Sequence, residues 1–524
     1  MMAAADIHAT RQARGLGLPT LAALAAGFGF AALQLWAFAL AGVFEYPLDD
    51  VYIHLAMAAN MAHGTYGVNA GESVSAASSI LYPVLLMPFP GSDMQRILPL
   101  VWNVVGVVLS GWLWGRTLLA GGLSGVSGGV LAVLGPLALN MPGVGFTGME
   151  NTLHTAASLA TLLGLWRFLR DGRIAPWFVL ALIVAPLLRL EGLALSMLAA
   201  GVVLLHGSRW TGLVLGAGVL APVLGFAAFL TSLGLAPLPV SIMAKIGLAA
   251  HGTHGLARLW TAVTANLATP PGQLLAALTV LCAALPLVLR GRLRHESALT
   301  LLVAAVAGAA HLLAGQIGWM HRYEHYIIAT QIAALTLAGA GLAGRRAWRW
   351  RAMLGGALVL AALAFWPKVA LTYIWNTRAV HLQQAQMGRF VQGWLKAPVV
   401  VNDLGRVAWA NPNYVLDIYG LGSAEALALR LRGDTPEGWA GPLAAHKGAQ
   451  MALIYDRWFG AAVGATWRRL ATLRMDNPRG VLGGFEVAFY ATDPAWAPAQ
   501  LALLHDFAAT LPAEAFLVFE GGAQ

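Results

Sequence analysis

Residues 21–54 read LAALAAGFGFAALQLWAFALAGVFEYPLDDVYIH. Residues 21–44 are almost entirely apolar and uncharged, and a helix needs about 20 such residues to cross a bilayer. Asp49 and Asp50 follow a few residues beyond that segment. The stretch therefore predicts a membrane-spanning helix with two adjacent carboxylates just outside the membrane.

The composition extends this prediction to most of the chain. Of its 524 residues 58% are hydrophobic and 10% are charged, whereas soluble proteins carry about 25% charged residues. The single cysteine, Cys282, excludes an internal disulfide. The net charge of +9 comes from arginines between apolar segments, which is typical of membrane topology signals rather than of a nucleic-acid surface.

Eleven apolar segments predict eleven spans. They lie near residues 21–44, 97–119, 126–142, 151–169, 176–188, 193–206, 211–233, 272–290, 298–315, 325–343 and 353–375. Arginines recur at every second connection, which is the positive-inside pattern. We therefore expect a polytopic α-helical membrane protein, with a cytoplasmic N-terminus and a C-terminus in the periplasm or outside the cell.

The first segment also has features of a signal peptide, since Arg11 and Arg14 precede it. It is longer than the 7–15 residues of a usual signal-peptide core, so we expect it to be retained. Two other segments depart from a simple span. Residues 80–90 contain three prolines and predict a short interfacial helix, and residues 176–206 predict a hairpin whose tip carries Arg189 and Glu191 outward.

The composition changes near residue 376. We expect a membrane domain over 1–376, with an outer loop over 45–96, and a periplasmic α/β domain over 377–524. The α/β domain is predicted to begin with a helix over 377–397 and to contain a helix over 423–432 with Ser423 as its N-cap. Its predicted strands lie near residues 399–401, 414–416, 451–455 and 485–490.

The aspartate pair has a chemical and a structural interpretation. Ionisable groups at membrane depth are costly unless they bind a metal, pair with cations or move protons. Alternatively, Asp49 is an N-cap and Asp50 complements the dipole of a helix over 49–63. We favour the chemical interpretation, because a cap needs only one acid. His54 shares a helix face with Asp50 and is either a ligand or a structural hydrogen-bond partner.

Other polar residues are predicted on the same outer side. They are Glu150, Arg189, Glu191, Lys245 and the segment 321–326 (HRYEHY). Cations and acids that converge on one cavity suit an anionic substrate with a leaving group. The structural alternative is internal ion pairing, such as Arg189 with Glu191 or Arg322 with Glu324.

These motifs resemble a known superfamily. The outer-loop sequence 49–64 (DDVYIHLAMAANMAHG), together with 67–72 (GVNAGE) and 78–82 (SSILY), resembles the first outer loop of the GT-C glycosyltransferases. Within that superfamily it is most similar to the bacterial group containing the mycobacterial terminal arabinofuranosyltransferases, and more loosely to the aminoarabinose and protein mannosyltransferases. The segments 148–153 (GMENTL) and 189–192 (RLEG) also look like motifs of that group. The sequence departs from it at Leu190 and at 75–77.

The resemblance implies transfer of a sugar from a polyprenyl-phosphate donor to an acceptor hydroxyl of a cell-envelope glycan, glycolipid or protein, at the periplasmic face of a bacterial inner membrane. Asp49 or Asp50 would be the general base or would hold a divalent metal, Mg or Mn. The residues expected to bind the donor phosphate are Lys245, Arg322, His325 and Arg189. Those expected in the substrate pocket are His54, Tyr52, Asn69, Glu72, Ser78, Glu150, Glu191 and Tyr326.

A physical argument favours the same chemistry. A sugar hydroxyl is weakly acidic and needs a carboxylate to accept its proton, and a departing lipid phosphate needs cations. The alternative function is a transporter or flippase of a lipid-linked sugar, with the acids as a proton relay. Transporters usually contain internal repeats, and the sequence contains no evident repeat. A structural scaffold would leave the acids unexplained.

Overall fold

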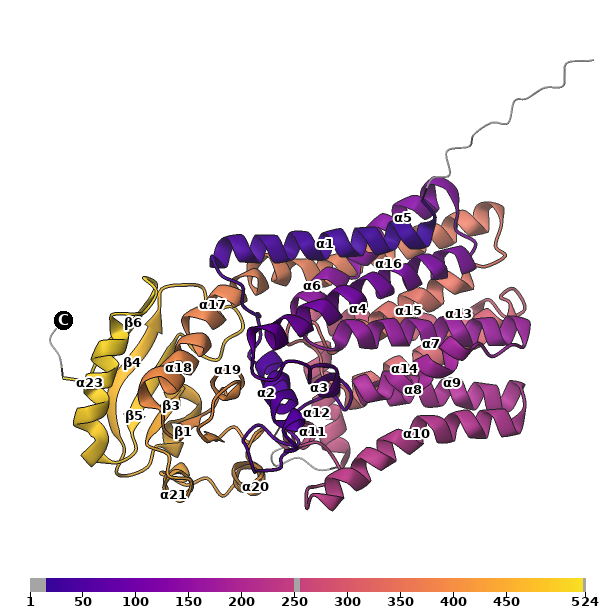
Figure 1. The fold of residues 1–524 in the computed structure, drawn as a ribbon. Coiled ribbons are helices and arrows are strands. Elements are labelled where there is room, and N and C mark those ends of the chain that lie inside the picture. The colour runs from indigo at the N-terminus through magenta and orange to yellow at the C-terminus, as the bar shows by residue number, and fades with distance from the viewer. Residues whose placement is uncertain (1–15, 249–254, 522–524) are drawn as a thin grey trace, which may run out of the picture.

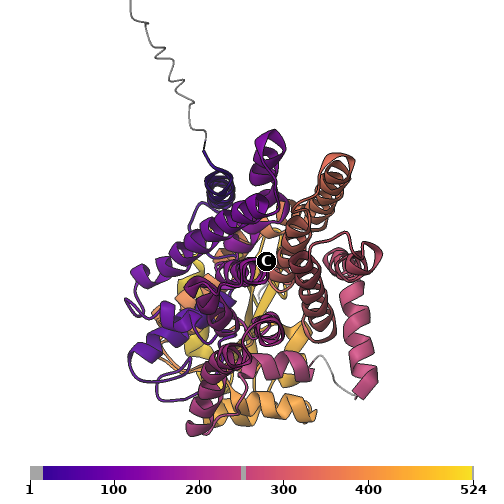
Figure 2. The same cartoon turned by 90° about the vertical axis from the view of Figure 1, so that its right-hand side faces the viewer.

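The computed structural model describes residues 16–248 and 255–521. It consists of a helical bundle joined at one end to a mixed α/β region (Figure 1). We call the end of the bundle next to the α/β region the domain face and the opposite end the far face. Figure 2 views the molecule from the far face, with the sheet behind the helices.

Each of the eleven predicted apolar segments forms a helix. These helices are α1 (Leu18–Ala41), α4 (Asp93–Ala120), α5 (Gly125–Ala138), α7 (Asn151–Asp171), α8 (Pro176–Leu188), α9 (Gly192–His206), α10 (Arg209–Ser232), α13 (Pro270–Val288), α14 (His295–Ala314), α15 (His325–Ala338) and α16 (Gly344–Leu371). Shorter helices lie between them: α2 (Asp50–Ala62), α3 (Tyr82–Leu85), α6 (Met141–Phe146), α11 (Val240–Leu248) and α12 (Gly255–Leu267).

In the described residues, 7 helices are long and apolar enough to cross a membrane. The protein is therefore mostly helical with seven candidate spans, as expected of a multi-pass membrane protein. α8, α9 and α15 are apolar but shorter than the usual span. α15 is buried along its whole length, so it is surrounded by protein rather than lipid. The count of eleven spans stays a prediction.

α1 and α4 pack closely because two glycines of α4 face α1. A Cβ atom at Gly111 would lie 2.6 Å from the carbonyl oxygen of Ala22, and one at Gly115 would lie 2.5 Å from that of Leu18. Small residues permit this close approach between membrane helices. α1 thus packs as part of the bundle, and its retention stays a prediction.

The two irregular segments agree in part with the sequence. The predicted helix over 49–63 is confirmed as α2. The helix expected over 80–90 is much shorter, since α3 covers only Tyr82–Leu85. The hairpin is confirmed: α8 ends at Leu188 and α9 begins at Gly192, so Arg189 and Glu191 lie at its tip.

The α/β region contains a six-stranded sheet in the order β2-β1-β3-β5-β4-β6. Its strands are β1 (Val399–Val401), β2 (Val415–Asp417), β3 (Met451–Ile454), β4 (Arg468–Met475), β5 (Glu486–Ala491) and β6 (Ala515–Phe519). β1 pairs in parallel with β2 and β3, and the other pairings are antiparallel. The four predicted strands are confirmed, whereas β4 and β6 were not predicted.

The α/β region also contains helices, which lie before and between the strands along the chain. They are α17 (Asn376–Leu382), α18 (Gln384–Phe390), α19 (Gly405–Ala408), α20 (Ala424–Arg432), α21 (Ala440–His446), α22 (Asp456–Phe459) and α23 (Ala497–Ala508). The predicted cap of α20 is confirmed, since the Ser423 hydroxyl accepts a hydrogen bond from the Ala426 N–H. The predicted helix over 377–397 is divided into α17, α18 and a π-helical turn over Val391–Leu395. The boundary predicted between residues 376 and 377 falls at the start of α17.

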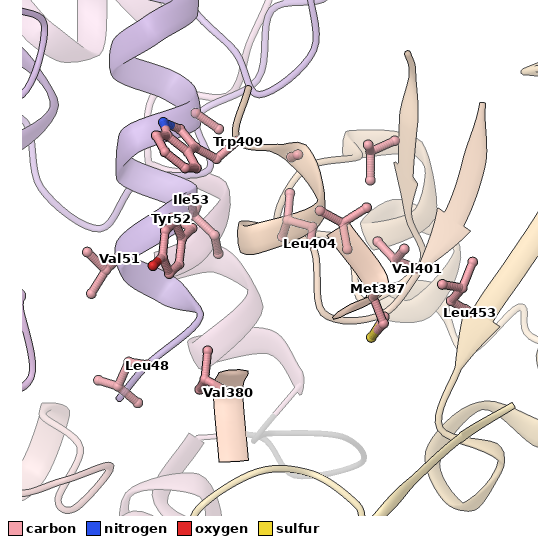
Figure 3. Close-up of a cluster of buried hydrophobic side chains, with 14 of the residues drawn as sticks. Leu48, Val51, Tyr52, Ile53, Val380, Met387, Val401, Leu404, Trp409 and Leu453 are labelled. Atoms are coloured by element: carbon pink, nitrogen blue, oxygen red, sulfur yellow. The ribbon is translucent and has the colours of Figure 1, made fainter. Parts of the chain in front are cut away.

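One apolar core continues from the bundle into the α/β region. Figure 3 shows Tyr52 and Ile53 of α2 on one side, Trp409 and Leu404 next to them, and Leu453 of β3 beyond. Buried apolar area of this kind stabilises by roughly 25 cal/mol per Å². The α/β region is therefore packed against the outer loop and is not merely tethered to it.

Asn69 of the outer loop acts as an additional partner for the edge strand β2. Its side-chain amide donates to the Val415 carbonyl at 3.0 Å, and its side-chain oxygen accepts from the Val415 N–H at 2.8 Å. Asn69 is buried, so both backbone groups of Val415 depend on it.

We expect Asn69→Ala to lower the stability of the full chain by about 1–3 kcal/mol, because it leaves two buried backbone groups unpaired. The measurement is thermal unfolding in detergent. Asn477→Ala is the control, since the Asn477 side chain bonds only to the adjacent Pro478 carbonyl. Equal melting temperatures for the two variants would contradict this role of Asn69.

Candidate functional site

Asp49 attaches the outer loop to the α/β region. It precedes α2, but its side chain makes no capping hydrogen bond to that helix. Its carboxylate instead accepts hydrogen bonds from the N–H groups of Gly405, at 2.7 Å, and Arg406, at 2.8 Å. The structural alternative, in which Asp49 caps the helix over 49–63, is therefore wrong. The Asp49 carboxylate instead binds the first N–H groups of α19, which lies more than 350 residues away in the sequence.

Asp50 has a different environment. It is the first residue of α2, and its side chain is 35% exposed. Its carboxylate accepts a hydrogen bond from Nη2 of Arg322. The expected pairing of Arg322 with Glu324 is wrong, because Glu324 instead accepts from the Gly318 N–H at 2.8 Å and contacts His321 at 3.1 Å. Asp50 is thus the more accessible acid of the pair.

Arg322 is buried and retains unused hydrogen-bond donors. Its Nη2 donates to Asp50 and to the Tyr323 hydroxyl, the latter at 3.0 Å. Its Nε and Nη1 are buried without a hydrogen-bond partner among the residues described. An unsatisfied buried donor costs about 1–3 kcal/mol, and more on a charged group. These atoms are therefore suited to bind an anion.

A second cluster surrounds Glu150, immediately before α7. Arg189 donates to Glu150 at 2.8 Å and to Glu191 at 2.7 Å, which confirms the expected Arg189–Glu191 pair. The Ser78 hydroxyl donates to Glu150 at 3.1 Å and lies 3.3 Å from Nε2 of His54. Five of the predicted site residues are therefore in direct contact.

Tyr323 connects the two clusters. The guanidinium carbons of Arg322 and Arg189 lie 5.0 and 5.1 Å from the centre of its ring, within the range of cation–π contacts. The two arginines, three carboxylates and His54 thus form one polar region at the domain face. Its cations and acids come from α2, the start of α7, the α8–α9 hairpin and the turn before α15.

Several predicted pocket residues are instead part of the interface with the α/β region. Tyr52 packs against Trp409, and Arg406 stacks on it at 5.2 Å. Asn69 pairs with β2, as described above. Glu72 forms an ion pair with Lys447 at 3.2 Å. Their contacts are with protein, so their role in a substrate pocket stays a prediction.

Two further predicted residues, His325 and Tyr326, make contacts within the bundle, and the prediction for a third, Lys245, is not tested. Both ring nitrogens of His325 contact other helices, at Thr155 and at the Leu139 carbonyl, which leaves neither for a phosphate. The Tyr326 hydroxyl donates to the Glu191 carbonyl at 3.3 Å. Lys245 lies in α11, and its side chain is outside the described residues.

Asp403 was not predicted as a site residue. It follows β1, and its carboxylate accepts hydrogen bonds from Gln384 at 3.0 Å and from the Tyr455 hydroxyl at 2.8 Å. Burial raises the pKa of Asp403, and the nearby Asp50 raises it further. Burial likewise raises the pKa of Asp49, with a contribution from Asp403. The α/β region thus adds a third acid beside the aspartate pair.

A divalent metal does not fit these acids well. Asp49 is bound to the backbone of α19, and Asp50 is paired with Arg322. Among the described residues, no group of three or more His, Cys, Asp or Glu side chains is arranged to hold a metal ion. Mg²⁺ and Mn²⁺ prefer several oxygen ligands, and here the neighbouring positive charge is supplied by arginine.

Comparison with known proteins adds one finding for the α/β region. Residues 374–490 match a family model described as "Domain of unknown function (DUF8728)". The match includes Asp403, the capped helix α19 and Tyr455. No curated protein matches the chain. The matched family covers a minor part of the protein and carries no assigned activity.

We expect Asp49→Asn to destabilise the full chain by about 1–3 kcal/mol. An amide can accept from only one of the two N–H groups of α19 and presents its own donor to the other. The control is Asp93→Asn, because the Asp93 side chain is 96% exposed and surface changes stay within about 0.5 kcal/mol. The melting temperature of Asp49→Asn should be lower than that of Asp93→Asn. Limited proteolysis should release the α/β region faster in Asp49→Asn. Equal melting temperatures and equal rates of proteolysis would show that the contact of Asp49 with α19 contributes little to stability.

Proposed function

We propose that this protein is a membrane glycosyltransferase that moves a sugar from a polyprenyl-phosphate donor to an acceptor hydroxyl of a cell-envelope glycan, glycolipid or protein. The observation that carries the proposal is the buried Arg322 guanidinium, which binds Asp50 through Nη2 while Nε and Nη1 have no partner among the described residues. The Arg322 guanidinium can thereby hold the donor phosphate beside Asp50, which would activate the acceptor hydroxyl.

The donor phosphate would bind the unpartnered nitrogens of Arg322. Arginine presents its donors in a planar fork that matches the oxygens of a phosphate. Arg189, on the same Tyr323 ring, supplies a second positive charge, although Glu150 and Glu191 already neutralise part of it. As the bond between sugar and phosphate breaks, these cations stabilise the negative charge on the leaving group.

Asp50 would act as the general base. Its side chain is 35% exposed, so an acceptor hydroxyl can approach it, whereas Asp49 is committed to α19. The acceptor oxygen bonds to the anomeric carbon, its proton passes to Asp50, and the polyprenyl phosphate leaves with the electron pair of the broken bond. General-base catalysis of this kind contributes typically 10²–10⁴-fold.

The membrane setting supports the same proposal. The C-terminal end of α7 and the N-terminal end of α16, which each carry more than one arginine, lie at the far face (Figure 1). By the positive-inside rule the far face is cytoplasmic and the domain face periplasmic. In the predicted eleven-span arrangement, the prenyl tail of the donor would stay in the bilayer while its head group reaches the polar region. The α/β region would help to bind the acceptor.

We expect Asp50→Asn and Arg322→Gln to abolish transfer, each with a loss of at least about 10² in rate. The assay is a gene deletion complemented with each variant, followed by mass spectrometry of envelope glycans, glycolipids and proteins for one missing sugar. Asp93→Asn, an exposed acid near the same face, should restore that sugar fully.

Expression and melting temperature of each variant distinguish lost chemistry from lost folding. The competing function is a transporter or flippase of a lipid-linked sugar. If purified protein moves such a lipid across vesicles, and Asp50→Asn stops that flux while glycosylation by other enzymes continues, the proposal is wrong. Full complementation by Asp50→Asn would also contradict it.

A further inference from the structure

A large apolar cavity lies between α4, α7 and α8, apart from the polar region. Its volume is about 490 Å³, within the range of small-molecule sites, roughly 300–1,000 Å³. α7 packs against both α4 and α8 and runs between them (Figure 1). Its face toward the cavity carries Ala156, Ala157 and Ala160. Because these alanine side chains are small, they leave a space that the larger side chains of α4 and α8 surround.

The cavity opens sideways, toward the region that lipid would occupy. Among its lining residues, Leu109 and Trp112 of α4 are 42% and 39% exposed, and Leu180 of α8 is 62% exposed. The lining extends along α4 from Trp102 to Arg116, a rise of roughly 21 Å at 1.5 Å per residue. Half of a bilayer core is roughly 15 Å thick, so the cavity is long enough for most of an acyl chain.

Charge is confined to one end of this cavity. Arg116 and Arg167 are the charged residues of its lining, and both lie near the far-face ends of their helices. Each guanidinium stacks on a tryptophan that also lines the cavity, at 5.1 Å for Arg116 on Trp112 and 5.6 Å for Arg167 on Trp177. The two arginines repel each other, and no hydrogen bond or ion pair to an acid is found for either within residues 16–248 and 255–521. The Asp171 carboxylate lies near enough to act on Arg167 through its charge, but its hydrogen bonds are with Arg170, at 2.7 and 2.6 Å. No described acid therefore binds either guanidinium directly.

We propose that the cavity binds an anionic glycerophospholipid of the far-face leaflet, with its phosphate on Arg116 and Arg167 and one acyl chain along α7. Basic pockets between membrane helices on the cytoplasmic side are suited to such head groups, and the fork of arginine fits the phosphate oxygens. The tryptophans hold the guanidinium planes over the entrance and sit at the depth that aromatic residues favour.

The position of the charges distinguishes this lipid from the sugar donor. At the domain-face end the cavity is lined by Leu81, Leu85 and Leu188, without a cation. A donor whose phosphate lay at Arg322 would leave Arg116 and Arg167 unpaired at the other end. The inference therefore does not depend on the proposed function.

The test is native mass spectrometry of the full chain in detergent. It is titrated separately with phosphatidylglycerol, with phosphatidylcholine of the same acyl chains, and with undecaprenyl phosphate. We expect preferential binding of phosphatidylglycerol, and a loss of at least about tenfold in affinity in the double variant Arg116→Gln/Arg167→Gln. Ala160→Phe, which fills the cavity and keeps both arginines, should cause a similar loss.

Arg173→Gln is the matched control, because Arg173 is an exposed arginine just beyond the same end of α7. It should bind phosphatidylglycerol like the unmodified protein. Melting temperatures in lipid-free detergent identify any variant that fails to fold, and Arg116→Gln alone then replaces the double variant. Unchanged binding in folded variants would overturn the proposal. Equal affinity for phosphatidylcholine, or tighter binding of undecaprenyl phosphate that only Ala160→Phe weakens, would also overturn it.

Discussion

The contact between the Asp49 carboxylate and the N–H groups of Gly405 and Arg406 determines how the two parts of the protein meet. Both ends of this contact are buried, so neither can exchange its partner for water at low cost. It fixes α19 against α2 and thereby brings Asp403 next to the aspartate pair. Asn69 and the apolar contacts around Tyr52 reinforce the same interface. The loop after the first span is consequently held from two sides.

This rigid loop gives the polar region a defined arrangement of charges. Asp50 cannot move far from Arg322, and Glu150 is held by Arg189 and Ser78. Buried charges are tolerated only when they are paired. In the polar region, the Nε and Nη1 donors of Arg322 have no hydrogen-bond partner among the described residues. Nearly every charge of the polar region is paired, whereas Arg322 is only partly paired. The region is therefore suited to admit a single anionic group.

The sequence located the helices well because long apolar segments bounded by arginines are a strong signal. It also located β1, β2, β3 and β5, whose short apolar segments lie between turn residues. β4 was missed because it begins with Arg468 and Arg469 and then buries four residues in succession, so it lacks strand alternation. β6 was missed although it alternates, since an isolated five-residue strand is a weak signal. For the site, residue types identified Asp50, Arg189 and Arg322 and the pairing of Arg189 with Glu191, but not the pairing of Arg322 with Asp50.

The amino-acid sequence alone was sufficient to predict a multi-span helical protein with an α/β region and an acid pair outside its first span. Hydropathy and arginine placement depend only on local composition, so they can be read without a structure. The tertiary structure decided which aspartate holds the two parts together and which faces a cation. It also decided that Arg116 and Arg167, far apart in the sequence, share one cavity. Such roles depend on segments separated by up to hundreds of residues, and only folding brings those segments into contact.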